Sequence, residues 1–437
     1  MTKIPISPEI IKNLSQTLGA TTPGNSSIRE IAQLVNKIEK HTGIRFVRME
    51  MGVPGLETSS IAIEAEIAAL KKGVAAIYPD INGIAPLKEE TSRFIKLFLD
   101  IDLNPQGCIP TVGSMMGGMV SFLVANRNDR TKEGTLFIDP GFPVQKQQVK
   151  MLGHDYRSFD VYNFRGKKLK DKLESYLKSG KISSLLFSNP NNPSWICLNQ
   201  EELAIIGELA NKYDVIVIED LAYFGMDFRK DYSTPGKPPY QPTVAHYAEN
   251  YIMLISSSKI FSYAGQRIGM MAISDKLFDR SYPDLLRYYS SDKFGHSAIF
   301  GALYALSAGV SHSVQYGLAA LLKAVNDGVY KFRDDIFEYG EKAREMKKMF
   351  LSNNFEIVYD KDLDEPLADG FYFTISYPGF SGRKLLEELL CYGISSISLD
   401  ISGSDKQGLR ACVSLVSRDQ FGDLGIRLKK FSDDHPV

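Results

Sequence analysis

The sequence predicts an α/β protein, a three-layer sandwich with a mostly parallel central sheet, together with a smaller α+β domain. Between about residues 105 and 275, short apolar runs alternate with helix-like segments. The runs are rich in β-branched and aromatic residues and show no polar–apolar alternation, which is typical of strands buried on both faces. They lie at 135–138, 184–187, 215–218 and 252–255. Strands that alternate with helices in this way indicate a parallel sheet.

The two ends of the chain predict the smaller domain. Apolar residues recur at helical spacing over residues 28–38, behind a serine pair that could cap the helix. In the C-terminal third we expect a helical stretch at 296–352, strands at 355–358, 370–376 and 409–414, and a helix at 382–392. The predicted domains are therefore a large one of residues 55–305 and a small one built from residues 1–54 and 306–437.

Composition and charge exclude several classes of protein. The chain has 437 residues, with 51 Lys and Arg against 52 Asp and Glu, so its formal net charge is −1. A neutral chain lacks the basic excess that drives binding to nucleic acid, and we expect no such binding. No apolar stretch is as long as a membrane span, and residues 1–20 lack the apolar core of a signal peptide. We therefore expect a cytoplasmic protein with no membrane partner.

Cysteine and histidine patterns indicate neither a metal site nor a disulfide framework. The four cysteines are scattered and include no Cys-x-x-Cys pair, and the six histidines form no ligand pair at useful spacing. Free thiols fit a reducing compartment. We expect no bound metal.

Polar residues gather just after the apolar runs. Residues 189–192 follow one run, Asp220 and Tyr223 follow another, and Lys259 follows a third. In an open α/β sheet, ligands bind beyond the carboxyl ends of the strands. We therefore expect these side chains to converge at one edge of the sheet.

Lys259 carries the most chemical information. Three serines precede it, and Arg267 follows within Gly-Gln-Arg-Ile-Gly. A lysine amine that loses its proton condenses with an aldehyde to form a Schiff base. The hydroxyl groups before Lys259 and the guanidinium after it suit an aldehyde that also bears a phosphate.

These motifs resemble those of class I/II pyridoxal-phosphate aminotransferases. The run Ser-Ser-Ser-Lys at 256–259 resembles the family's cofactor-lysine segment, and Asp-Leu-Ala-Tyr at 220–223 has its Asp-x-x-Tyr spacing. Asn-Pro-Asn-Asn-Pro-Ser at 189–194 resembles Asn-Pro-x-Asn-Pro-Thr-Gly, with Ser194 and Trp195 in place of Thr and Gly. The resemblance extends over about residues 50 to 415 and implies the fold of these pyridoxal-phosphate-dependent transferases.

The resemblance implies the catalytic groups. Lys259 would hold pyridoxal 5'-phosphate as an internal aldimine and move the substrate proton. Asp220 would bind the ring nitrogen, while Tyr223 and Asn192 would bind the phenolic oxygen. A pyridinium would also supply the cationic partner that a carboxylate at a buried strand end needs, although an aspartate there could instead cap a helix.

The remaining cofactor contacts also follow from the resemblance. A phosphate needs backbone N–H groups at a helix start together with positive charge. Phe142 takes the place of the aromatic residue that stacks on the ring. The residues implied as phosphate ligands are Gly113, Ser114, Met115, Ser256 and Arg267.

Three further residues concern the substrate and the assembly. Arg410 matches the family arginine that binds the substrate α-carboxylate, with Asn192 beside it, and Gly52 matches a glycine whose backbone meets the same group. Tyr78 matches a tyrosine that reaches the phosphate of the neighbouring subunit. The resemblance therefore implies a homodimer with shared active sites.

The implied function is transfer of an amino group from an L-amino acid to a 2-oxo acid by a ping-pong mechanism. Aspartate-type or aromatic substrates with 2-oxoglutarate are expected, and branched-chain amino acids remain open as well. A pyridoxal-phosphate-dependent carbon–sulfur lyase of the same fold is the main alternative. A non-enzymatic regulator with an aminotransferase-like domain is less favoured, because such proteins carry a basic DNA-binding module ahead of that domain.

Overall fold

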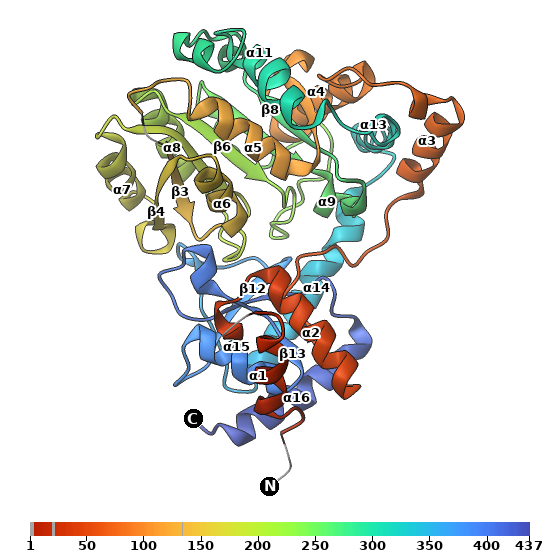
Figure 1. The fold of residues 1–437 in the computed structure, drawn as a ribbon, viewed down its shortest axis with the longest axis vertical. Coiled ribbons are helices and arrows are strands. Elements are labelled where there is room, and N and C mark those ends of the chain that lie inside the picture. Colours follow the sequence, from red (N-terminus) through yellow and green to blue (C-terminus); the bar gives the residue numbers. More distant parts are fainter. Residues whose placement is uncertain (1–3, 20–21, 133) are drawn as a thin grey trace. The chain divides into compact units, whose positions relative to one another are not determined.

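The computed structural model describes residues 4–19, 22–132 and 134–437, which form two compact units. The large unit comprises residues 56–191 and 197–336. The small unit comprises the described residues up to 55, together with 192–196 and 337–437. Figure 1 shows both units as ribbons.

A seven-stranded sheet forms the centre of the large unit among the described residues, and its strand order is β2-β8-β7-β6-β5-β3-β4. Neighbouring strands from β4 to β7 are parallel, whereas β8 is antiparallel to both β7 and β2. The strands are β2 (Cys108–Thr111), β3 (Gly134–Asp139), β4 (Asp155–Asp160), β5 (Ile182–Ser188), β6 (Ile216–Leu221), β7 (Tyr251–Ser256) and β8 (Gly269–Ile273). All four strands expected from apolar runs are present, and the predicted α/β sheet is confirmed.

Helices cover this sheet, and their apolar sides form the core. The chain alternates strand and helix through α5 (Gly113–Ala125), α6 (Pro143–Met151), α7 (Lys168–Leu177) and α8 (Gln200–Lys212). Buried residues of α5, such as Phe122, pack with those of the strands, such as Leu254. The other helices of this unit are α3 (Ser60–Lys71), α4 (Ala85–Leu99), α9 (Ser257–Ile260), α10 (Asp275–Asp279), α11 (Phe294–His296), a π-helix (Ser297–Leu303), α12 (Tyr304–Ser307) and α13 (His312–Asn326).

The helical stretch expected at 296–352 is divided into several helices. Ala308 ends α12 in the left-handed conformation, at φ 52°, and Gly309 follows at φ 108°. The next helix, α13, packs on α3 and α4 and so lies in the large unit. The structural division therefore falls within α14 (Phe332–Leu351), near residue 337, whereas the sequence pattern placed a domain boundary at 305.

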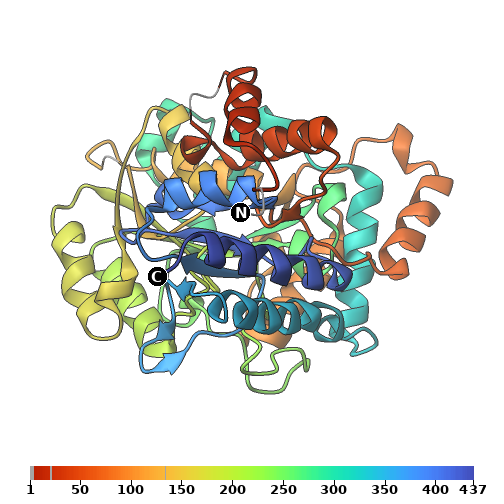
Figure 2. The same ribbon diagram turned by 90° about the horizontal axis from the view of Figure 1, so that it is seen from below.

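A four-stranded antiparallel sheet organises the small unit in the order β14-β15-β12-β9. These strands are β9 (Glu356–Ile357), β12 (Tyr372–Ser376), β14 (Ile397–Ser398) and β15 (Leu409–Cys412). Two short pairs accompany them, β1 (Val47–Arg48) with β13 (Ile394–Ser395) and β10 (Lys361–Asp362) with β11 (Glu365–Pro366). Figure 2 shows the helices α1 (Pro8–Gln16) and α2 (Ile28–Thr42) of this unit in red and α15 (Gly382–Cys391) and α16 (Phe421–Asp434) in blue. Residues 337–351 of α14 also belong to this unit.

The expected N-terminal helix is confirmed as α2. Its N-cap is Ser27, whose side chain accepts from the Glu30 amide while the Glu30 carboxylate accepts from the Ser27 amide. This reciprocal capping box satisfies two amides that a helix start leaves open. Gly43 ends the helix in the left-handed conformation.

Candidate active site

Lys259 lies one helical turn beyond the end of strand β7. The side chain of Ser256 accepts a hydrogen bond from the Ser258 amide at 3.2 Å and so begins the short helix α9. Ser257 Oγ donates to the Ile268 carbonyl at 2.6 Å, which ties this turn to the segment that carries Arg267. The serine run therefore has a local structural role, because it fixes the half-buried Lys259 at the end of the sheet.

An uncapped helix start meets a guanidinium at the beginning of α5. Gly113 begins this helix at φ 68°, and no side chain caps its first amides. A Cβ atom on Gly113 would lie 2.6 Å from Nη2 of Arg267, so any other residue here would displace the guanidinium from the helix start. Ser114 and Met115 follow in the first turn, half-buried and exposed respectively. Open amides beside a positive charge form a site for an anion such as phosphate.

Asp220, near the end of β6, is a buried carboxylate with uncharged donors. It accepts from the Ala222 amide at 3.1 Å and from Gln145 Nε2 at 2.8 Å. Burial raises the pKa of Asp220 to about 6. Tyr223, three residues further on, is also buried. A cation next to Asp220 would offset the cost of burying its charge.

Helix α6 links Asp220, the start of α5 and Phe142, and no sequence motif indicated this role. Its Gln145 donates to Asp220, and its Gln148 donates to the Met115 carbonyl at 2.9 Å. The half-buried Phe142 stands at the N-cap of the same helix. No motif marks a glutamine that reaches a carboxylate 75 positions away, so spacing alone could not identify Gln145.

Arg410 forms the corresponding feature of the small unit, a buried cation with uncharged acceptors. It lies on β15 and is 4% exposed. Its Nη2 donates to the Glu50 carbonyl and its Nη1 donates to Asn192 Oδ1 at 3.4 Å. Within the described ranges, no carboxylate forms an ion pair with Arg410. A buried guanidinium of this kind is suited to an external carboxylate.

Two further contacts fix the surroundings of Arg410. The Glu50 carboxylate accepts from Arg48 at 2.8 Å and from Ser395 Oγ at 2.6 Å, which holds the backbone that Arg410 contacts. A Cβ atom on Gly52 would lie 2.0 Å from the Tyr372 hydroxyl, so this position requires glycine. The structure thus brings the predicted residues Arg410, Asn192 and Gly52 into one cluster and adds Glu50, which no sequence motif indicated.

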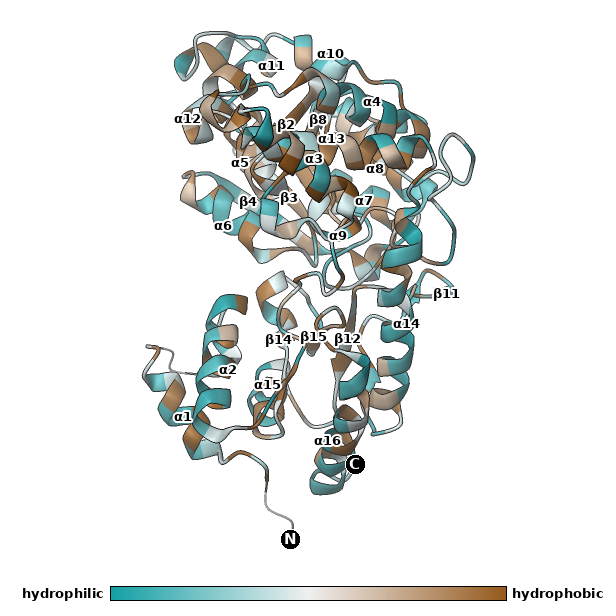
Figure 3. Ribbon diagram, turned by 90° about the vertical axis from the view of Figure 1, so that its right-hand side faces the viewer, coloured by the Kyte–Doolittle hydropathy of each residue, from teal (hydrophilic) through white to brown (hydrophobic). Residues whose placement is uncertain are grey.

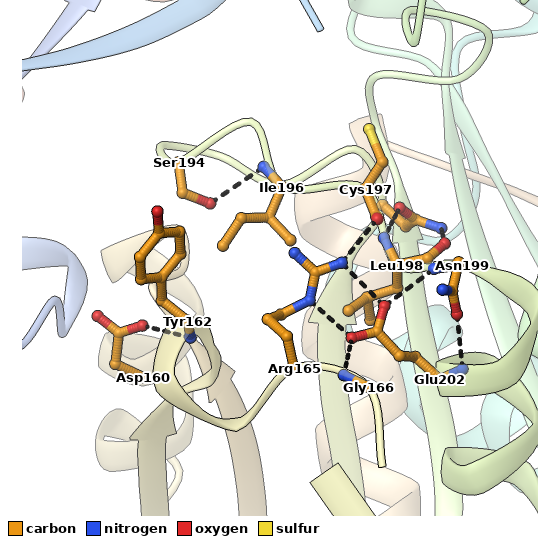
Figure 4. A network of polar contacts seen from close by, with 11 residues as sticks. Asp160, Tyr162, Arg165, Gly166, Ser194, Ile196, Cys197, Leu198, Asn199 and Glu202 are labelled. Carbon is orange, nitrogen blue, oxygen red and sulfur yellow. Dashed lines mark hydrogen bonds and ion pairs between the residues drawn. The ribbon is translucent and has the colours of Figure 1, made fainter. Parts of the chain in front are cut away.

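A buried ion pair anchors the chain just after the Asn-Pro loop, as Figure 4 shows. Arg165 donates to the Glu202 carboxylate at 2.7 Å and to the Cys197 carbonyl at 3.1 Å. Asn189 and Leu198 exchange hydrogen bonds across the base of the loop, at 3.0 and 3.4 Å. These contacts fix both ends of the segment on which Asn192 lies.

Tyr78 stands apart from the residues above. It is 90% exposed, and its hydroxyl makes no hydrogen bond to a described residue. The loop that carries it is tied down at Asn82, because Lys88 Nζ donates to the carbonyls of Asn82 and Gln106. Nothing in the described chain explains the exposure of this ring.

The described residues contain no cluster of histidine, cysteine, aspartate and glutamate that could hold a metal ion. None of the described helices combines the length and the apolar character needed to cross a membrane.

Comparison with known proteins identifies the family of this chain. The model of the family "Aminotransferase class I and II" matches residues 46–350, which is more than half of the chain. The chain belongs to this family. Its members use pyridoxal phosphate, so the predicted family, enzyme class and cofactor are confirmed: the protein is a pyridoxal-phosphate-dependent aminotransferase.

Relatives of this aminotransferase differ in their named substrates. It is 26% identical to the probable aspartate aminotransferase of Methanocaldococcus jannaschii over 345 residues, 74% of this chain and 85% of the relative. The solved alanine aminotransferase of Pyrococcus furiosus shares the fold at a TM-score of 0.75 and 17% identity, covering 93% of this chain and 97% of the other. The aspartate aminotransferase of Thermotoga maritima does so at 0.74 and 19%, with coverage of 93% and 97%.

Proposed function

We propose that this aminotransferase moves the amino group of an L-amino acid to a 2-oxo acid by a ping-pong mechanism. The observation that carries the proposal is a pair of buried charges whose hydrogen-bond partners are neutral, the Asp220 carboxylate and the Arg410 guanidinium. Such charges are costly unless a ligand pairs them. A protonated pyridine ring and an amino-acid carboxylate are the two ions that would do so.

Asp220, Tyr223 and Asn192 would bind the ring of pyridoxal phosphate. The Asp220 carboxylate would accept from the ring N–H, which favours its ionised form and keeps that proton on the nitrogen. Tyr223 and Asn192 would donate to the phenolic oxygen. Phe142, at the start of the helix that supplies Gln145 to Asp220, would lie against the ring face.

The start of α5 and Arg267 would bind the phosphate. The open amides of Ser114 and Met115, the Ser256 hydroxyl and the Arg267 guanidinium supply the donors that a dianion needs. The close approach of Arg267 to Gly113 supports this assignment, because it places the charge at the helix start.

Lys259 would be the covalent anchor and the acid–base group. When bound, pyridoxal phosphate supplies an aldehyde that condenses with amines and a ring that withdraws electrons from the substrate. The substrate amine would displace Lys259, whose freed amine would then remove the α-proton and return it at another carbon. Its position directly after β7 supports this double role.

Arg410 would orient the substrate through its α-carboxylate, with Asn192 and the backbone at Gly52 beside it. A guanidinium binds a carboxylate through two parallel hydrogen bonds, which fixes the direction of the Cα–H bond. The relatives named for aspartate and alanine both take substrates with this group. We propose aspartate-type or aromatic amino acids, with 2-oxoglutarate as acceptor.

We propose further that the enzyme acts as a homodimer in the cytoplasm. Tyr78 is almost fully exposed, and an apolar stripe formed by Ile63, Ile67 and Leu70 runs along α3 in the same unit. Figure 3 shows hydrophobic segments along this helix. A second chain would cover this stripe and receive Tyr78 at its phosphate. The four free cysteines suit a reducing compartment.

A half-reaction screen tests the function. Holoenzyme is mixed with each amino acid in turn, without acceptor, and loss of the absorbance of the lysine-bound cofactor is followed. We expect one amino acid to react in a single turnover and to yield its 2-oxo acid in stoichiometric amount. Repeated turnover without acceptor, with release of pyruvate from cystine, would instead establish elimination and refute transamination.

A further inference from the structure

Trp195 occupies an unusual backbone position in the loop that carries Asn192. Its φ angle is 64°, in the left-handed region, and its side chain is 1% exposed. Bulky residues rarely adopt this conformation because their Cβ atom crowds the backbone. The sequence therefore keeps a strained tryptophan where the family pattern has glycine, which points to a role for the indole ring.

The indole packs into a space shaped for it within the small unit. A Cβ atom on Gly370 would lie 2.1 Å from Cε2 of Trp195, so glycine is required opposite the ring. The ring of Tyr372 meets the indole edge-on, with centroids 6.0 Å apart and planes at 69°. Trp195 thus fixes the position of Tyr372 from one side.

Tyr372 in turn supports Arg410. The guanidinium carbon of Arg410 lies 4.6 Å from the centroid of the Tyr372 ring, which is a cation–π contact. Strand pairing explains the contact, because Arg410 lies opposite Thr374, and Tyr372 is the diagonal neighbour on the same face of the sheet. The Tyr372 hydroxyl lies against Gly52, which restrains the ring at its other end.

We propose that Tyr372 and Trp195 are positioning residues that fix the guanidinium of Arg410 for the substrate carboxylate. This inference rests on the proposed role of Arg410. The two acceptors of Arg410 fix only two nitrogens, one of them through a 3.4 Å contact with Asn192. The Tyr372 ring supports the guanidinium from one side, and Trp195 prevents that ring from turning away.

Carboxylate affinity tests the inference in the holoenzyme. The dissociation constant of succinate is measured by calorimetry for Tyr372→Leu, Tyr372→Phe and Trp195→Phe. Phe373→Leu is the matched control, because Phe373 is buried on the opposite face of β12 against Phe350. We expect Tyr372→Leu to weaken succinate binding by about 3- to 30-fold, the range of a cation–π contact.

Tyr372→Phe keeps the ring and should stay within about twofold of the wild type, Trp195→Phe should fall between the two Tyr372 variants, and Phe373→Leu should not change the affinity. A second readout compares the half-reaction of an amino acid with that of the amine that lacks its carboxylate. In Tyr372→Leu, the half-reaction of the amino acid should need a higher concentration than in the wild type, whereas that of the amine should not change.

Three results would overturn the inference: unchanged succinate affinity in Tyr372→Leu, an equal loss in Phe373→Leu, or no succinate binding by the wild type. A protein that binds succinate with the expected pattern but converts no amino acid would refute the proposed function and leave these positioning roles intact.

Discussion

Replacing Asp220 by asparagine should stabilise the cofactor-free protein and weaken its affinity for the cofactor. The side chain is buried, and its donors, Gln145 Nε2 and the Ala222 amide, are uncharged. Asparagine keeps the shape and removes the buried charge. Higher stability without the cofactor, together with weaker cofactor binding, distinguishes a carboxylate that pairs with a bound cation from one that only caps a turn.

The size of the expected gain in stability follows from the raised pKa of Asp220. Burial moves the pKa of Asp220 from 3.8 to about 6, and two pH units correspond to about 3 kcal/mol. The folded protein holds the Asp220 proton more tightly than the unfolded chain does. The contribution of protonated Asp220 to stability is therefore complete below pH 3.8 and is lost as the pH rises to about 6. Asp220→Asn should therefore gain up to about 3 kcal/mol at pH 8 and almost nothing near pH 4.

Urea unfolding of the cofactor-free forms measures this difference, and titration with pyridoxal phosphate measures the affinity. Removing one partner of a buried ion pair costs about 3 to 5 kcal/mol, so affinity should fall by at least about 100-fold. Glu219→Gln is the matched control. Glu219 precedes Asp220 on β6 and points to the opposite face, where Thr243 and the Val244 amide donate to it and burial raises its pKa to about 8.

The control should leave the affinity for pyridoxal phosphate unchanged. If Asp220→Asn loses stability in the cofactor-free form, or binds the cofactor as tightly as the wild type, the proposed pairing of Asp220 with the ring nitrogen is wrong.

Three other experiments probe the phosphate site, the substrate site and the assembly. Gly113→Ala should lower cofactor affinity in a fluorescence titration, because its Cβ would displace Arg267 and strain a residue at φ 68°; unchanged affinity would contradict the phosphate assignment. Arg410→Lys should raise the KM for the amino acid by about 10- to 100-fold through loss of the paired hydrogen bonds, and an unchanged KM would exclude Arg410 from carboxylate binding. Coexpressed Lys259→Ala and Tyr78→Ala chains should form one native site in each mixed dimer, which is about one quarter of all sites after random pairing, whereas no regain of activity would exclude a shared site.

The strand-end residues could be predicted because their positions follow from local pattern. An apolar run followed by Asp220 or Lys259 shows where a strand stops, and the parallel arrangement brings such ends to one edge of the sheet. The capped helix at 28–42 followed from short-range spacing in the same way.

Contacts between distant segments could not be predicted. Gln145 reaches Asp220, and Trp195 packs on Gly370, only because the fold brings these positions together. Glu50 acts through its backbone carbonyl, which no side-chain pattern reveals. The break at Ala308 was missed as well, since alanine favours helices and its left-handed conformation depends on the surrounding packing.

The central claim is that Lys259 carries the cofactor, and chemical trapping tests it most directly. Holoenzyme is reduced with borohydride, digested, and analysed by mass spectrometry for a lysine that bears the reduced pyridoxyl phosphate group. The modification is expected on the peptide that contains Lys259, and Lys259→Ala should yield no modified peptide. A modified lysine elsewhere in the chain, or an equally modified Lys259→Ala protein, would contradict the account.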